Sequence, residues 1–423
     1  MPTLTPASIM IERKMTKTTQ SDIATIDYAV REHRSLWVDA WRRLVSSRTA
    51  KAGLFIVSFL ILSTVLAHFF WEYNPKTDLD YTLKLKPPTL IPNEEVPSVH
   101  IFGTDKLGRD IFRRVVHGGW NTLMVGIIAV TISLVIGGLL GLLAGFFESI
   151  EMTRLEKILL LVFLGGLMGF LPAWIAEQPV QVVLFALLGG AAAMFENFLA
   201  GRSARVVLFA AVGLLIGGGL ALFVSPYTAI VTGLLGGLIG AALALQLGGS
   251  LFSNITMRAM DIVLAFPSYL LAIAIVAFLG TGLEKGMVAI GIVSIPVFAR
   301  LVRSSVLSVV QKEYILAAQS VGEGHGRIIF RHIFPNVLSP ITVQTTLGIG
   351  SAILAAAALG FLGLGAVPPE PEWGAMLGDS YKYLSSGAWW AVVFPGVAIM
   401  LIVLGFNLLG DGLRDALDPK MKV

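Results

Sequence analysis

Long apolar runs separated by short polar breaks dominate the pattern of this chain. Helical residues rise 1.5 Å each, so about 20 apolar residues cross a hydrocarbon core roughly 30 Å thick. The pattern therefore predicts an all-α polytopic membrane protein. Its predicted spans are 53–71, 120–147, 158–176, 180–199, 205–224, 227–248, 261–280, 286–302, 337–363 and 388–410.

Lys and Arg alternate between successive breaks. They occur at Arg154 and Lys157, at Arg202 and Arg205, and at Arg258, whereas the breaks between these positions carry none. Cytoplasmic loops of membrane proteins are the ones enriched in Lys and Arg. We therefore expect both termini in the cytosol, with 299–331 cytosolic and 366–387 outside.

Composition supports this class. Hydrophobic residues make up 55% of the chain and charged residues 14%, against roughly 25% charged in soluble domains. The net charge is +4, and much of the basic excess precedes residue 52, which indicates cytosolic anchoring rather than nucleic-acid binding. The absence of cysteine excludes disulfides and thiol catalysis, and the six histidines form no cluster with metal-ligand spacing. We predict no metal site.

The first 52 residues are polar, so the first apolar run begins far from Met1. A cleavable signal peptide has its apolar stretch much closer to the N-terminus, and we therefore predict that the first span is not cleaved. Within this cytosolic tail, residues 35–44 have apolar positions at helical spacing beside Arg42 and Arg43, which is typical of a helix lying on the membrane surface. Three further segments follow this tail: 53–147 holds two spans and the polar loop between them, 148–252 holds about four spans, and 253–423 holds four spans and the cytosolic segment 313–336.

The cytosolic segment 313–336 predicts two short helices that meet at 321–326, with Pro335 starting the next span. Small Ala317 and Ala318 allow another surface to approach closely. Four apolar side chains, which exceed the need of a lone loop, suggest a docking element: Ile315, Leu316, Ile328 and Ile329. The alternative, an amphipathic hairpin on lipid headgroups, explains the Arg and Ile content but not the order of Glu, Ala and Gly.

This order, E-Y-x-x-A-A-x-x-x-G ending in H-x-x-P-N, resembles the EAA loop of permeases from ATP-binding-cassette importers. Residues 103–110, with Arg113 after them, resemble the G-T-D-x-x-G-R-D signature of the dipeptide/oligopeptide/nickel group, in its C-type subunit. Residues 260–267 are similar to the M-x-D-x-x-L-A-F-P start of a core span. The resemblance covers about 35–147 and 255–420.

Two sets of candidate site residues follow from the resemblance. The ATPase-coupling set is Glu313, Tyr314, Ala317, Ala318, Gly322, Arg327, His332, Pro335 and Asn336. The extracytoplasmic set is Gly103, Thr104, Asp105, Gly108, Arg109, Asp110 and Arg113.

Residues 105–114 have charges at helical spacing after Thr104, which predicts a short helix capped by Thr104. Asp105–Arg109 and Asp110–Arg114 would form its ion pairs, whereas Arg109–Arg113 would oppose it. A brace at the mouth of the pathway, a contact with a binding protein and a plain surface helix all fit this segment.

The resemblance implies a six-span permease core, paired with a homologous second permease, two cytosolic ATPases that use ATP and Mg, and an extracytoplasmic solute-binding protein. The membrane would be a bacterial or archaeal cell (inner) membrane. This chain departs from the family pattern by an insert at 148–252 of about four spans, an even number that keeps 313–336 cytosolic. Smaller departures are Phe334 and the turn Glu323-Gly324-His325.

Other functions fit less well. A secondary transporter usually needs an ionisable residue deep in a span, and the core spans carry only terminal ones, such as Asp261 and Arg300. No Walker motif occurs, so we expect no enzyme activity and no bound cofactor on this chain. Peptide is the favoured cargo. Nickel, another small solute and a non-transporting scaffold remain alternatives.

Overall fold

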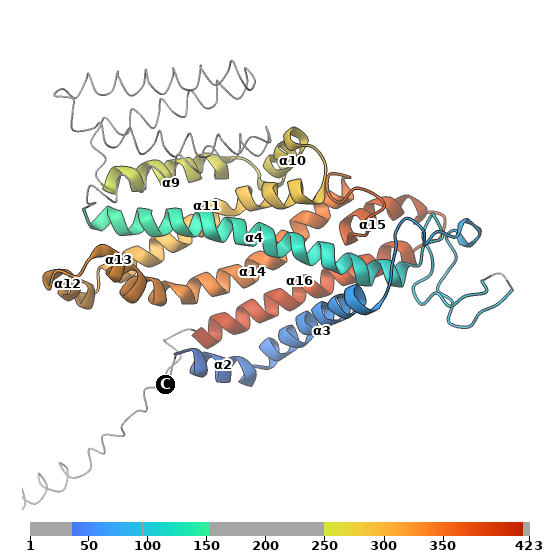
Figure 1. The fold of residues 1–423 in the computed structure, drawn as a ribbon, viewed down its shortest axis with the longest axis horizontal. Coiled ribbons are helices and arrows are strands. Elements are labelled where there is room, and N and C mark those ends of the chain that lie inside the picture. Colours follow the sequence, from blue (N-terminus) through green and yellow to red (C-terminus); the bar gives the residue numbers. More distant parts are fainter. Residues whose placement is uncertain (1–35, 95, 152–248, 418–423) are drawn as a thin grey trace, which may run out of the picture.

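The computed structural model describes residues 36–94, 96–151 and 249–417, and every regular element in these ranges is helical (Figure 1). The predicted spans 158–176, 180–199, 205–224 and 227–248 lie outside the described residues, as does the tail before Leu36. Two short 3-10 helices lie in the loops, η1 (Tyr81–Leu83) and η4 (Tyr381–Tyr383).

Five described helices are long and apolar enough to cross a membrane, and they confirm five of the predicted core spans. The second, α4, is 39 residues long because it begins well before the apolar run that marked it in the sequence. The five are α3 (Arg48–Phe70), α4 (Ile111–Ser149), α11 (Leu283–Val310), α14 (Phe334–Phe361) and α16 (Trp390–Leu417).

The remaining core run, 261–280, was predicted as one span, and the structure divides it between two helices. It falls on α9 (Gly249–Ala265) and α10 (Ser268–Leu279), which are bent by 91° at the break between them. Pro267 lies at this break; it has no backbone N–H and disfavours the helical conformation of the residue before it. The pair is therefore one broken span or a re-entrant segment.

Helix α4 is the centre of the bundle. It packs against α11 and α14, and α16 lies between α14 and α3 (Figure 1). Glycines allow the closest of these contacts: a Cβ added to Gly141 would lie 2.3 Å from the carbonyl oxygen of Ala299 on α11. Lipid tails are as apolar as the helices, so the hydrophobic effect does not drive helices together within a membrane. Close van der Waals packing at small residues stabilises their association instead.

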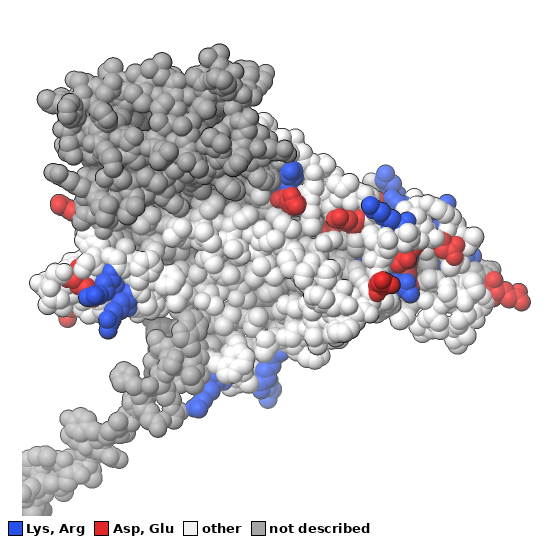
Figure 2. Space-filling view, in the orientation of Figure 1, with Lys and Arg blue, Asp and Glu red and all other residues white. Residues whose placement is uncertain are grey.

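On the visible face, most charged side chains lie toward the two ends of the long axis, and most of the described surface between them is uncharged (Figure 2). The long helices run along this axis (Figure 1). Uncharged surface along the middle of the helices is the pattern that hydrocarbon requires.

The amphipathic segment at 35–44 coincides with helix α2 (Leu36–Ser46), as predicted. Leu44 is buried beside Ala50 of α3 and Ala416 of α16, while Trp41 is exposed. Helix α2 is thus packed against the bundle, at the end that also carries segment 313–336 (Figure 1). Its contact with the membrane surface stays a prediction.

Candidate functional sites

The extracytoplasmic set forms a tight turn rather than the predicted helix. Thr104 and Asp110 pair as an antiparallel bridge, and α4 begins only at Ile111, where the carboxylate of Asp110 accepts the Arg113 backbone N–H at 2.9 Å. Gly108 shows why the helix prediction was wrong. Its φ of +77° is left-handed, and a Cβ there would lie 1.7 Å from the carbonyl oxygen of Asp80.

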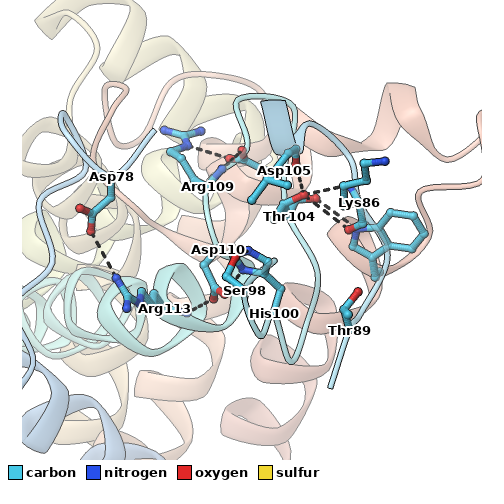
Figure 3. Close-up of polar contacts among 12 residues, drawn as sticks. Asp78, Lys86, Thr89, Ser98, His100, Thr104, Asp105, Arg109, Asp110 and Arg113 are labelled. Carbon is cyan, nitrogen blue, oxygen red and sulfur yellow. Dashed lines mark hydrogen bonds and ion pairs between the residues drawn. The ribbon is translucent and has the colours of Figure 1, made fainter. Parts of the chain in front are cut away.

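Asp105 lies at the centre of this turn, is only 3% exposed and binds two arginines, of which Figure 3 labels Arg109. Its Oδ2 accepts hydrogen bonds from Nε of Arg109 at 2.7 Å and from Nη1 of Arg114, and its Oδ1 accepts the backbone N–H groups of Leu107 and Arg109. Burial alone would raise the pKa of Asp105, but the two guanidiniums and the backbone donors outweigh burial and hold it below its usual value. The predicted pair Asp110–Arg114 does not form, since Arg114 turns to Asp105 instead.

Thr104 fixes the turn to the rest of the fold. Its hydroxyl donates to the carbonyl of Leu83 and accepts the backbone N–H of Lys86 at 2.8 Å (Figure 3). Its own carbonyl accepts the indole N–H of Trp390 at 3.1 Å, which connects the turn to the start of α16.

The outer charges of the set bind neighbouring segments. His100 contacts Asp110 Oδ2 at 2.6 Å and Ser98 at 2.8 Å, while Arg113 lies 3.8 Å from Asp78 (Figure 3). Lys106, beside the signature, forms an ion pair of 2.7 Å with Asp379 of α15 (Trp373–Ser380). The set is therefore an internal brace, not a surface helix, and buried Asp105 and Arg109 are closed to direct contact with a partner.

Glu372 is a buried group that the sequence analysis missed. It is 1% exposed, and its two carboxylate oxygens accept the backbone N–H groups of Gly374 and Ala375 at 2.8 Å, which caps the start of α15. Thr122 of α4 approaches the same carboxylate at 3.4 Å. Burial raises the pKa of Glu372, and these hydrogen bonds only partly oppose the rise. In sequence it looks like one more acid in a polar loop.

The coupling set lies where α11 turns back into α14. The first predicted helix is confirmed as α12 (Glu313–Ser320), and Gly322 after it has the left-handed φ of +76°. The second is not separate: α13 (His325–Arg327) and the π turn η3 (Ile328–Ile333) run directly into α14. Pro335 lies at the start of α14, as predicted, although the preceding turns are continuous with this helix. The wider π turn comes just before it, where the missing proline N–H interrupts regular α-helical bonding.

Three of the four predicted docking side chains face inward, so the prediction was wrong for them. Ile315, Ile328 and Ile329 are buried against the C-terminal ends of α4 and α11. Of the four side chains, only Leu316 is exposed, at 56%. The three isoleucines cover apolar side chains of both helices, among them Phe146 of α4 and Val306 of α11. The isoleucines anchor the loop to the bundle.

The outward side of the loop is an open hollow of about 580 Å³. Glu323, which the sequence analysis treated only as a departure, holds its floor by contacts of 2.8 Å with His332 and 3.8 Å with Arg327. Glu313, Pro335 and Asn336 do not line it; the Asn336 side chain donates to the carbonyl of His332 at 2.6 Å. The lining residues are Tyr314, Ala317, Ala318, Val321, Gly322, Glu323, Arg327, Arg331 and His332.

Apolar spans around a broken helix pair, with a braced turn at one end and a hollowed loop at the other, define a polytopic helical membrane protein. The family model for binding-protein-dependent transport system inner membrane components matches residues 233–423. The model for the N-terminal transmembrane domain of oligopeptide transport permease C matches residues 35–88.

Curated relatives match along nearly the whole chain. A dipeptide transport system permease protein of Alkalihalophilus pseudofirmus is 38% identical over 92% of this chain and 91% of its own length. A di/tripeptide transport system permease protein of Pseudomonas aeruginosa is 35% identical over 90% of this chain and 91% of its own length. A glutathione transport system permease protein of Pectobacterium atrosepticum is 34% identical over 92% of this chain and 93% of its own length. The chain belongs to the family of binding-protein-dependent transport system inner membrane components.

Proposed function

We propose that this chain is the permease subunit of an ATP-binding-cassette importer for short peptides and forms half of its transmembrane pathway. The hollowed loop 313–336 is the observation that carries the proposal, since it is packed onto the bundle by buried isoleucines and offers a hollow that another protein could occupy. The names of the three relatives favour short peptides over nickel and over a scaffold without transport activity.

The proposed complex contains a homologous second permease, two ATPases that use ATP and Mg, and a solute-binding protein outside. Loop 313–336 then faces the cytosol with both termini, and turn 103–113 faces the binding protein from a bacterial or archaeal inner membrane. The brace around Asp105 supports this role, because it holds the outer ends of α4, α15 and α16 in one unit.

Force would pass from the ATPase to the spans through the buried isoleucines. Ile315 lies in α12, and Ile328 lies in the π turn that continues into α14. Both pack against α4 and α11, so a displacement of α12 cannot be absorbed by the loop alone. The ends of three spans would move with it.

Replacing Ala317 by Trp tests this proposal. Ala317 is exposed and lines the hollow, so a Trp there fills the docking surface without entering the core. Ala318 is a poorer probe, because it is 8% exposed and a large side chain would disturb the loop itself. Ser320→Trp is the matched control: Ser320 is exposed on the same helix but does not line the hollow.

In a reconstituted complex, Ala317→Trp should abolish the stimulation of ATPase activity by loaded binding protein, or release the ATPase, while the second permease still co-purifies. Ser320→Trp should behave as the wild type. Normal stimulation and uptake with Ala317→Trp would refute the coupling role of this loop.

A further inference from the structure

Helices α14 and α16 each carry one amide side chain without a partner in the described part of the chain. Gln344 is half-buried on α14 and Asn407 is exposed on α16, and neither side chain makes a hydrogen bond to a described residue. The neighbouring hydroxyl groups, by contrast, all have partners. Each donates to the backbone carbonyl four residues earlier, in Thr342, Thr345 and Thr346.

An amide cannot face lipid cheaply. Both residues lie well inside helices that qualify as membrane spans, where hydrocarbon offers no hydrogen-bonding partner. Helix α14 lies between α11 and α16 with α4 packed on it, so its remaining open side is where Gln344 can reach a polar environment (Figure 1).

Both amides lie along α14. Gln344 and exposed Ser351 are seven residues apart and share a face of α14, because two helical turns separate them. Asn407 reaches α14 from the neighbouring helix α16: its Oδ1 lies 3.5 Å from the position that a Cβ on Gly350 would take. Gln344 and Gly350 are six residues apart, or about 9 Å along the helix, the length of an extended peptide of about three residues.

We propose that Gln344 and Asn407 line the transport pathway and form hydrogen bonds with the backbone of a peptide in transit. This inference rests on the proposed function. A side-chain amide both donates and accepts, as a peptide group does, so it can replace water on the backbone whatever the peptide side chains are. No charged residue occurs in α14, and none in α16 before Asp411, so this surface would not select peptides by charge.

Gln344→Leu, Asn407→Leu and the double variant test the inference in the reconstituted complex with its binding protein. Removing one partner of the peptide backbone should lower uptake per ATP hydrolysed about fivefold, and removing both more than tenfold. The factor should be the same for dipeptides with acidic, basic and apolar side chains, and stimulation of the ATPase by binding protein should be unchanged.

Thr345→Val is the matched control, because its hydroxyl already bonds to the Ile341 carbonyl, at 2.8 Å. It should import at the wild-type rate, and Gln344→Asn should keep most of the uptake. Normal uptake by the double variant would overturn the inference. Loss of the second permease on purification would overturn it too, because the amides would then be contacts between permeases. A wild-type complex that imports no peptide would refute the proposed function itself, and this inference with it.

Discussion

Asp105 and Arg109 form a buried ion pair across a turn, with 2.7 Å between Oδ2 and Nε, although their spacing of four residues fits a helix. The turn forms because Gly108 takes a left-handed conformation against Asp80. Arg114 from the first turn of α4 donates to the same carboxylate oxygen. One carboxylate therefore holds two guanidiniums and joins the outer loop to the central helix.

Asp105→Asn should strongly destabilise the permease. Removing one member of a buried charge network leaves the others uncompensated, which typically costs about 3–5 kcal/mol. Thermal unfolding of the detergent-solubilised complex measures the loss. Asp78→Asn is the control, because Asp78 and Arg113 are 34% and 43% exposed and 3.8 Å apart, and such pairs contribute about 0–1 kcal/mol. Equal midpoints for the two variants would show that the buried network does not stabilise the loop.

The hydrophobic pattern predicted the fold well because hydrocarbon imposes one simple requirement. Every backbone polar group must be bonded within its own helix, so an apolar run of about 20 residues has only one stable form. Helices α3, α11, α14 and α16 accordingly lie on the runs that predicted them. The bend of 91° at Pro267 could not be predicted in this way, since an apolar run shows that a segment is helical but not where the helix axis changes direction.

The candidate sites were predictable as segments but not as surfaces. The motif placed Ala317 and Ala318 side by side, yet only the packing of Ile315 into the bundle decides that Ala317 is exposed and Ala318 is covered. Likewise, Gly108 needs its conformation because of Asp80, 28 positions earlier. Such relationships arise in the tertiary structure and leave no local pattern.

The orientation of the chain can be tested with single cysteines, since the protein contains none. Ser320 and Ser386 are both exposed, at opposite ends of the bundle, in loop 313–336 and in the loop before α16. In intact cells, a membrane-impermeant thiol reagent should label Ser386→Cys and should not label Ser320→Cys. After permeabilisation both should react, which controls for accessibility. Labelling of Ser320→Cys in intact cells would reverse the orientation.

Glu372 should give the protein a stability component that falls as pH rises. Because its pKa is raised in the folded state, the folded protein keeps this proton at pH values where the unfolded chain has lost it. The folded state then binds more protons, and the free energy of unfolding decreases with pH. The decrease begins near the ordinary glutamate value of about 4.3 and ends once the pH passes the raised pKa.

Glu372→Gln isolates this component, because glutamine fills the same space beside Thr122 and Gly374 without titrating. The unfolding midpoint of the variant minus that of the wild type should rise with pH above about 4.3 and then level off. Glu370→Gln, an exposed change in the same loop, should leave the wild-type pH dependence in place. Parallel curves for Glu372→Gln and the wild type would mean that the carboxyl is ionised in the folded state as readily as in the unfolded chain. The cap of α15 would then hold a charge, and burial between α4 and α14 would not disfavour it.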